Sequence, residues 1–400
     1  MQIGLVGKPS SGKSSFFTAS TMIQVPISSR PFTTIEPNKG IGLIRVECVE
    51  NFFQVKCNPR YGKCVQGTRF VPVELIDVAG LVPGAHEGKG LGNQFLDDLR
   101  KADALIHVVD ASGLTDNEGK PVQAGLHDVC NDIEFLEKEI DYWFAGILEK
   151  NWGKLVRSPA SMKQQVIDLF TSIVSGLGIK GSQIDEALKQ SGLTEKKLRD
   201  WSKEEILLFA KALREKSKPI LVAANKADLP ESKENIKRML EKFPDKKIIS
   251  CSAASEIALK KAREQGLIDY LEGGNSFTVL KEKELNEKQS IGLELIKKNV
   301  LDIFGNTGIQ QALESAVLDL LSYFPVFPGG VHKLSDSEGR VLPDCYLMPK
   351  NSTALDFAFR LHTDLGEGFI KAIDVKTKKL IGRDYLLKAG DVVEIVFKKK

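Results

Sequence analysis

A glycine-bounded segment near the N-terminus has the residue types and spacing needed to hold a chain of phosphate groups. It consists of Gly7, Lys8, Pro9, Ser10, Ser11, Gly12, Lys13 and Ser14, with Ser15 directly after it. The apolar residues 3–6 predict a buried strand before the segment, and residues 15–19 predict a helix after it. In such a strand–loop–helix unit, backbone N–H groups surround the phosphates at the helix N-terminus. We expect Lys13 to reach the β- and γ-phosphates and the Ser14 hydroxyl to bind Mg²⁺.

Two further segments have residues suited to sensing the terminal phosphate. Thr34 lies in the proline-bounded residues 31–37. A threonine hydroxyl in such a loop can bind Mg²⁺ while the γ-phosphate holds the loop in place. Residues 70–77 predict a strand that ends at Asp77, and Gly80 follows three residues later. We expect Asp77 to hold Mg²⁺ through water and the Gly80 N–H to contact the γ-phosphate.

A later segment predicts which base is bound. After the apolar residues 219–224 come Asn225, Lys226, Ala227 and Asp228. The Asp228 carboxylate can accept two hydrogen bonds, from the ring N–H and the exocyclic amine of guanine, whereas adenine offers neither donor there. We expect the Lys226 stem to cover one face of the base and Asn225 to tie this loop to the phosphate loop. One strand later, backbone N–H groups that can meet the base carbonyl are expected at Ser252, Ala253 and Ala254.

These motifs predict binding of GTP and GDP and a slow intrinsic hydrolysis of GTP. The residue after Gly80 is Leu81, not the glutamine that orients the attacking water in many GTPases. We therefore expect the rate to be raised by a partner, a monovalent cation or a residue of a flexible loop. His86 and His127 are candidates for that role, although a histidine at either position is more often structural. The predicted catalytic set is Lys13, Thr34, Gly80 and His86.

The elements that position these residues indicate an α/β domain with two additions. Apolar residues recur at three- and four-residue steps over 133–147, and further helical patterns follow at 160–176, 182–191 and 203–217 without strands between them. This predicts a helical domain inserted into a sheet domain. The last seventy residues alternate short strands, one helix and turns, as in a β-grasp module, after a predicted hinge at 325–330. The predicted domains are 1–125 and 218–325 for the sheet domain with its connecting helices, 126–217 for the insertion and 326–400 for the C-terminal module.

The composition is that of an ordinary globular protein. Four hundred residues with 42% hydrophobic and 27% charged residues predict two or three domains. The formal net charge of +3 is too small to indicate a nucleic-acid partner by itself. No apolar run approaches the length of a membrane span and no signal peptide precedes the first strand, so we expect a cytoplasmic monomer without membrane contact.

The six cysteines do not predict a disulfide framework in a long chain of this kind. Cys57 and Cys64 lie close together, with Cys48 upstream. A metal-binding knuckle is conceivable there, but zinc ligands usually come as two closely spaced pairs, and no second pair follows. The sequence therefore favours free thiols in a loop.

The segments around the motifs resemble those of the Obg-related GTPases, and the whole chain resembles archaeal proteins of the YchF subfamily. The resemblance rests on residues 31–38, on 77–85, on 90–96 and, near the C-terminus, on 361–369. It implies a P-loop NTPase G domain with an inserted α-helical domain and a C-terminal, ubiquitin-like TGS domain. It also implies a Mg²⁺-dependent switch associated with the ribosome or RNA, with Thr34 as the Mg²⁺-binding threonine of the switch loop.

Two departures from the family pattern affect these expectations. Bacterial and eukaryotic YchF proteins often lack the final aspartate of the base motif and favour ATP, whereas Asp228 restores the preference for guanine. The family P-loop usually has an asparagine where this chain has Ser10. Because that asparagine helps to bind K⁺ in relatives, Ser10 puts activation by K⁺ in question.

Three other functions remain as alternatives. An ATP-hydrolysing YchF-like switch would tolerate adenine despite Asp228. A P-loop kinase is disfavoured by the complete base motif and by the lack of an arginine-rich lid. An RNA-binding module with weak nucleotide turnover is disfavoured by the intact Lys13, Ser14, Thr34 and Asp77.

Overall fold

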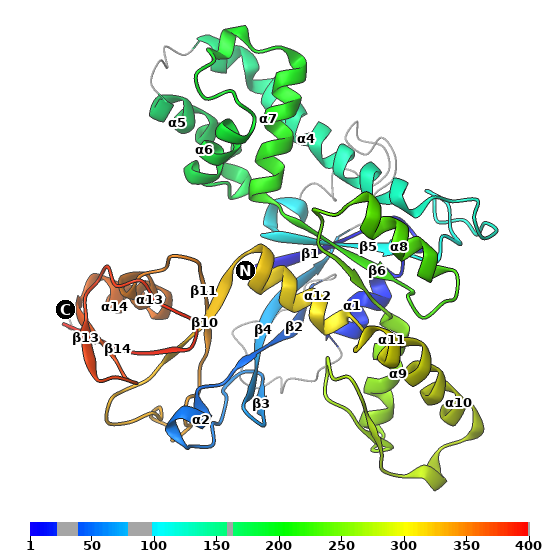
Figure 1. Cartoon of the computed structure of the whole chain (residues 1–400). Coiled ribbons are helices and arrows are strands. Elements are labelled where there is room, and N and C mark those ends of the chain that lie inside the picture. The colour runs from blue at the N-terminus through cyan, green and yellow to red at the C-terminus, as the bar shows by residue number, and fades with distance from the viewer. Residues whose placement is uncertain (22–38, 79–97, 158–162, 399–400) are drawn as a thin grey trace. The chain divides into compact units, whose positions relative to one another are not determined.

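The computed structural model describes residues 1–21, 39–78, 98–157 and 163–398 (Figure 1). The chain forms two compact units. Within the described residues, the first unit comprises 1–21, 39–40 and the described parts of 74–312, and the second comprises 41–73 and 313–398. None of the described helices is long and apolar enough to cross a membrane.

The largest sheet of the chain is mostly parallel, and its strands β1, β5, β6 and β7 and the end of β4 belong to the first unit. The strand order is β2-β4-β1-β5-β6-β7, and β3 pairs with β4. Strand β1 runs parallel to β4 and β5, β5 to β6, and β6 to β7. The strands span β1 Gln2–Val6, β2 Lys39–Glu47, β3 Lys63–Val65, β4 Thr68–Asp77, β5 Ala104–Asp110, β6 Ile220–Asn225 and β7 Ile248–Ser250. All seven residues of β5 are buried, as expected for the central strand of a parallel sheet covered on both faces.

The strand registers bring the carboxyl ends of four strands to one edge of this sheet. Leu5 of β1 lies beside Asp77 of β4, and Asp110 of β5 lies beside Asn225 of β6. Ligands bind at this edge of open α/β sheets. Helix α1 Lys13–Thr21 follows β1, α8 Ser232–Lys242 follows β6, and α9 Ala253–Glu264 follows β7.

The predicted helical insertion lies between β5 and β6, and its helices lie together in Figure 1. They are α4 Val129–Arg157, α5 Lys163–Val174, α6 Gly181–Gln190 and α7 Lys203–Ser217, with 3₁₀ turns at Ser175–Leu177 and Leu198–Asp200. Their apolar faces form one core with the sheet, in which Ile140 and Phe170 are fully buried. A buried ion pair adds to this core, because Arg214 Nε donates to Asp141 at 2.8 Å. The insertion is thus an internally packed bundle.

The remainder of the first unit follows β7 and leads into the second unit. A two-stranded sheet pairs β8 Ile268–Asp269 with β9 Thr278–Val279. The helical segments that follow are Glu282–Glu284 (3₁₀), α10 Glu287–Ile296, a π-helical stretch Lys297–Leu301, α11 Asp302–Phe304, α12 Ile309–Glu314 and a second π-helical stretch Ser315–Leu320.

The second unit contains the predicted β-grasp module. Its five-stranded sheet has the order β11-β10-β14-β12-β13, with β10 parallel to β14. Phe357 of α13 is fully buried in its core. The elements are β10 Tyr323–Pro328, β11 Tyr346–Pro349, α13 Ala354–Leu361, α14 Thr363–Glu367, β12 Phe369–Asp374, β13 Lys379–Ile381 and β14 Asp391–Phe397.

The predicted hinge at 325–330 is wrong for its first four residues, because they belong to strand β10. Pro325 pairs with Leu347 of β11, and Pro328 pairs with Val393 of β14. Proline removes an N–H donor, but the Pro325 carbonyl still accepts a hydrogen bond from the Gly390 N–H at 2.8 Å. The prolines therefore lie within a paired strand instead of separating two domains.

Segment 41–73 packs against the β-grasp residues inside the second unit, which the sequence did not predict. The fully buried Arg69 donates to the carbonyls of Leu342 and Pro343 at 3.0 and 2.7 Å. The N–H of Asn58 donates to the Val341 carbonyl at 2.8 Å. These contacts join residues that lie far apart in the sequence, so no local pattern could indicate them.

Candidate nucleotide-binding site

The loop between β1 and α1 has backbone conformations that suit a phosphate loop. Ser10 and Gly12 have φ of 61° and 88°. A Cβ on Gly12 would lie 2.3 Å from Nδ2 of Asn225, so only glycine fits beside that side chain. The Phe16 N–H donates to the Gly12 carbonyl at 2.8 Å and begins the helix, while Ser14 and Ser15 are exposed at its first turn. The N-terminus of α1 is thus accessible to an anion.

Lys13 and Asp77 meet beside this loop. The Lys13 ammonium forms an ion pair with Oδ1 of Asp77, and both side chains are more than four-fifths buried. Asp77 ends β4, and Lys13 begins α1, so the parallel pairing of β1 and β4 brings them together. The pair thus puts a cation and a hard oxygen ligand at the start of α1, where Ser14 is exposed.

Asn225 connects the phosphate loop to the predicted base loop. Its Nδ2 donates to the Ser11 carbonyl at 3.1 Å, and its Oδ1 accepts from the Ala253 N–H at 3.1 Å. The side chain is buried, so both hydrogen bonds are shielded from water. One amide therefore fixes the P-loop, the end of β6 and the start of α9 relative to one another.

Lys226 has a left-handed backbone, with φ of 63°, and its side chain belongs to a network around Asp110. Its ammonium lies 2.8 Å from Oδ2 of Asp110, which also accepts from the Thr115 hydroxyl at 2.7 Å. Oδ1 accepts from the N–H and hydroxyl of Ser112 at 3.1 and 2.5 Å. Burial opposes ionisation of Asp110, but the hydrogen bonds from Lys226, Ser112 and Thr115 outweigh it and hold its pKa below the ordinary value. An ionised Asp110 therefore anchors the Lys226 ammonium.

Ser252, in the loop between β7 and α9, orients the side chain of Asp228. Its Oδ1 accepts the Ser252 hydroxyl at 2.6 Å, and its other oxygen has no hydrogen bond within the part of the chain that the structure describes. Ser252 is the N-cap of α9, because its hydroxyl accepts from the Ser255 N–H. Ala253 is buried, whereas Ala254 is exposed. The arrangement presents a half-exposed carboxylate with one free oxygen at the carboxyl edge of the sheet.

Comparison with known proteins agrees with this geometry. Models of three families match the chain: a 50S ribosome-binding GTPase over residues 2–140, the G4-motif-containing domain of the YGR210-like Obg-like GTPases over 223–330, and the TGS domain over 336–397. An uncharacterized GTP-binding protein of Methanocaldococcus jannaschii is 47% identical over 98% of both chains. The ribosome-binding ATPase YchF of Mycoplasma genitalium is 30% identical over 99% of both chains.

A solved structure agrees as well. The GTP-binding protein from Pyrococcus horikoshii OT3 is 38% identical, covers 100% of both chains and has a TM-score of 0.78. This chain belongs to the YchF/Obg-like GTPase family. It is accordingly a P-loop nucleoside-triphosphate hydrolase with a G domain, a helical insertion and a TGS domain, as the sequence predicted.

In this YchF/Obg-like GTPase the side chain of Lys8 contacts protein groups and not the expected nucleotide site. Lys8, predicted among the nucleotide-binding residues, is buried. Its ammonium lies 2.9 Å from Oδ2 of Asp132, donates to the Thr115 carbonyl at 2.7 Å and lies 3.1 Å from Nε2 of His127. Its charge is thus held between the P-loop and the start of α4, which leaves only its backbone for phosphate binding.

The same cluster includes one of the two histidines considered for orienting water. Nε2 of His127 lies 2.9 Å from Oδ1 of Asp132, and the His127 side chain is only 9% exposed. Burial raises the pKa of Asp132 above its ordinary value although Lys8 and His127 oppose that shift. His127 is therefore part of a buried polar cluster that joins the G domain of this YchF/Obg-like GTPase to its insertion.

Three predicted residues, Thr34, Gly80 and His86, lie outside the described residues. Two residues of the site were missed in the sequence. Asp110 could have been found, because it directly follows residues 104–109, which are apolar except for His107, and so lies at the carboxyl end of a strand pattern. Asp132 could not, since it lies at the start of an amphipathic helix, where an acidic residue is common without any partner.

Proposed function

We propose that this GTPase binds GTP with Mg²⁺, hydrolyses it slowly and uses the two nucleotide states to control its association with the ribosome. The observation that carries the preference for guanine is the orientation of Asp228 by Ser252. One carboxylate oxygen is fixed and the other is free, which suits the two adjacent donors of guanine. Adenine has no donors there, so its binding would leave the carboxylate unpaired.

The residues near the P-loop suit Mg²⁺. A serine hydroxyl and a carboxylate are hard oxygen donors, which Mg²⁺ prefers over nitrogen or sulfur. Ser14 is exposed, and Asp77 is paired only with Lys13 among the described residues. We propose that Ser14 and Asp77 hold the ion, together with Thr34 by resemblance. When bound, Mg²⁺ would neutralise charge on the β- and γ-phosphates.

Lys13 would exchange partners when nucleotide binds. In the structure its ammonium neutralises Asp77. A triphosphate offers several anionic oxygens to the same ammonium, and the charge of Mg²⁺ would replace that of Lys13 beside Asp77. The exchange keeps both groups paired throughout binding, so neither is left as an isolated, partly buried charge.

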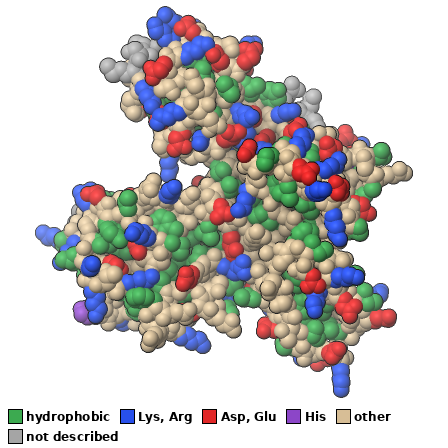
Figure 2. All heavy atoms as spheres, in the orientation of Figure 1, with side chains coloured by type: hydrophobic (Ala, Val, Ile, Leu, Met, Phe, Trp, Pro, Cys, Tyr) green, Lys and Arg blue, Asp and Glu red, His purple; other side chains and the backbone are tan. Residues whose placement is uncertain are grey.

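The ribosome association rests on the relatives. The family model over residues 2–140 is named for 50S ribosome binding, and the Mycoplasma relative is named a ribosome-binding ATPase. Lysine, arginine and acidic side chains are interspersed over the face shown in Figure 2. With a net charge of only +3, we expect binding through a defined local surface instead of general attraction to RNA.

The deciding experiment is a competition among nucleotides with Asp228→Asn. Wild type should prefer GTP to ATP, and xanthosine triphosphate should bind weakly because its base carries an oxygen where guanine has the amine. The amide introduced by the substitution would offer one acceptor and one donor, so the variant should lose GTP affinity and gain affinity for xanthosine triphosphate. Asp245→Asn, at an exposed position on the same unit, is the matched control. Equal affinity of wild type for ATP and GTP would instead support the ATP-hydrolysing alternative.

A further inference from the structure

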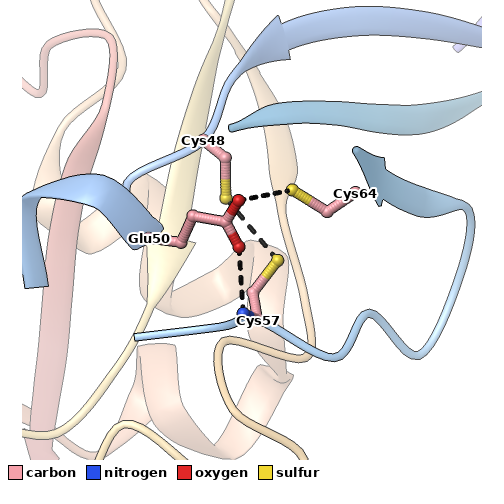
Figure 3. Close-up of side chains that lie close together, drawn as sticks. All are labelled: Cys48, Glu50, Cys57 and Cys64. Carbon is pink, nitrogen blue, oxygen red and sulfur yellow. Dashed lines mark hydrogen bonds between the residues drawn. The ribbon is translucent and has the colours of Figure 1, made fainter. Parts of the chain in front are cut away.

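Three cysteines and a glutamate gather in the second unit, in the stretch of sequence between the P-loop and Asp77. They are Cys48, Glu50, Cys57 and Cys64, here called the cysteine cluster (Figure 3). One ligand atom from each lies within 4.8 Å of all the others. In Figure 3 the three sulfurs point toward the Glu50 carboxylate from separate segments. Cys48 directly follows β2, Cys57 lies in the loop after α2 (Glu50–Phe53), and Cys64 belongs to strand β3.

We propose that the cysteine cluster binds one Zn²⁺ ion, with three thiolates and one carboxylate oxygen as ligands. Soft thiolates favour Zn²⁺ over harder divalent cations, and a four-ligand site without an open position is typical of structural zinc. Binding releases one proton from each of the three thiols to solvent. Neither the family relatives nor the proposed GTPase activity assigns such a site.

The distances within the cluster are close to those of a tetrahedral site. With Zn–S bonds near 2.3 Å, adjacent sulfurs of a tetrahedron are about 3.8 Å apart. The sulfurs of Cys48 and Cys57 are 3.8 Å apart, which also shows that they do not form a disulfide. Sulfur and oxygen ligands of such a site are about 3.6 Å apart. Sγ of Cys64 lies 3.3 Å from Oε1 of Glu50.

The cluster is held in place by the backbone. Oε2 of Glu50 accepts from the Cys57 N–H at 3.0 Å, and Oε1 accepts from the Gly67 N–H at 2.9 Å. The Cys48 N–H donates to the Gly67 carbonyl at 2.8 Å. The side chains of Cys48 and Cys57 are 3% and 8% exposed, so these metal-ligating groups are ordered and shielded from solvent before any ion binds.

A buried arginine points independently to an anionic group at this place. Arg69 is 1% exposed, and no carboxylate lies within ion-pair distance of it among the described residues. Its Nη1 lies 3.6 Å from Sγ of Cys57, and its other partners are the neutral carbonyls of Leu342 and Pro343. Asp344 is near but pairs with Arg60 at 3.6 Å. A zinc ion with three thiolates and one carboxylate has a net charge of −2, which would compensate the guanidinium.

The proposed zinc site would also link separate segments of the second unit. The site would join three segments of 48–64 and fasten them beside Arg69, which contacts residues 342–343 of the same unit.

Metal content of the full-length protein tests the proposal. The chain is purified under a thiol reductant after growth with zinc, and metals are measured by mass spectrometry. We expect one zinc per chain in wild type, and loss of that zinc in Cys57→Ser. Cys130→Ser replaces a buried free cysteine outside the cluster and should keep the zinc. Zinc-free wild type, or unchanged zinc in Cys57→Ser, would overturn the proposal.

Titration of wild type with Co²⁺ tests the proposed ligands even if Cys57→Ser does not fold. Metal-free wild type titrated with Co²⁺ should develop a sulfur-to-cobalt charge-transfer band and intense tetrahedral d–d bands. Glu50→Gln should keep the charge-transfer band and bind Co²⁺ more weakly. Absence of the band in wild type contradicts the site. So does a Cys48–Cys57 disulfide that persists under the reductant and excludes the metal. Unchanged Co²⁺ affinity in Glu50→Gln would contradict the assigned carboxylate ligand.

Discussion

The side-chain nitrogen of Asn225 donates a hydrogen bond to the backbone carbonyl of Ser11, 214 positions earlier in the chain. The same amide accepts the Ala253 N–H through its oxygen. Because the position of a Gly12 Cβ would overlap this amide, the P-loop and the base loop are fitted to each other without room for a side chain. The two halves of the nucleotide site thus share one buried residue.

Replacing Asn225 by alanine should disturb both halves at once. Asn225→Ala leaves the Ser11 carbonyl and the Ala253 N–H unpaired, at a cost of about 1–3 kcal/mol for each buried group. We expect a lower melting temperature and an affinity for fluorescent GDP that falls by about tenfold or more. Asn131→Ala, an exposed asparagine on α4, is the control. If Asn225→Ala keeps wild-type GDP affinity, the amide does not organise the site.

Lys13→Ala tests the phosphate contact separately. The substitution removes a charge-assisted hydrogen bond worth roughly 1.5–3 kcal/mol, so nucleotide affinity should fall about tenfold or more. It also leaves Asp77 without its cation, so we expect the apparent affinity for Mg²⁺ in the absence of nucleotide to rise. Isothermal titration measures both quantities. The exposed Lys101 supplies the control variant Lys101→Ala. Unchanged nucleotide affinity in Lys13→Ala would place the phosphates elsewhere.

The sequence predicted the parts of this site that depend on local order. The apolar runs before Gly7 and Asn225 predicted β1 and β6, and parallel pairing then brings their carboxyl ends to one edge. The direction of the Lys8 side chain could not be predicted in that way. Its partners lie 107 and more positions away, and the charge of Lys8 alone suits a phosphate equally well.

In the second unit, too, local patterns were predicted from the sequence but contacts between distant segments were not. The sequence predicted short strands and one helix in the last seventy residues because their patterns are local signals, but it did not predict α14 as a second helix. The contact of Arg69 with residues 342–343 and the convergence of three cysteines depend on how 41–73 folds against the β-grasp residues. Irregular spacing of the cysteines hid the cluster, since a turn and helix α2 bring them together instead of a regular motif.

A buried histidine predicts how stability depends on pH. His107 lies in the middle of β5, and burial, with the nearby charges of Lys246 and Lys8, lowers its pKa to about 3. The unfolded chain protonates this histidine below about pH 6.5, whereas the folded chain does not. Its contribution to stability is therefore complete above about pH 6.5 and is lost as the pH falls toward about 3. Between pH 7 and 5 the expected loss is about 2 kcal/mol.

The matching measurement compares the melting temperature at pH 7 and pH 5 in three proteins. His107→Leu removes the titrating group and should weaken the pH dependence relative to wild type. His332→Leu, at an exposed histidine, should behave as wild type. An equal drop between pH 7 and 5 in wild type and His107→Leu would show that other groups cause the acid sensitivity.

The TGS domain provides the test of the proposed ribosome association. Exposed residues surround a surface pocket lined by Phe359, Ile370 and Arg383, and Lys371 lies directly after Ile370 in β12. Cationic side chains beside exposed apolar ones can combine phosphate contact with stacking on unpaired bases. We therefore expect Lys371→Glu with Arg383→Glu to reduce co-sedimentation with ribosomes and to make the remaining binding less sensitive to salt. The rate of GTP hydrolysis without ribosomes should not change, because neither residue belongs to the nucleotide site.

The control variant Lys189→Glu, on the exposed face of α6, reverses a charge elsewhere and should leave co-sedimentation intact. If the double variant sediments as wild type does while Asp228→Asn still alters base preference, the nucleotide assignment stands and this face of the TGS domain is not the ribosome contact.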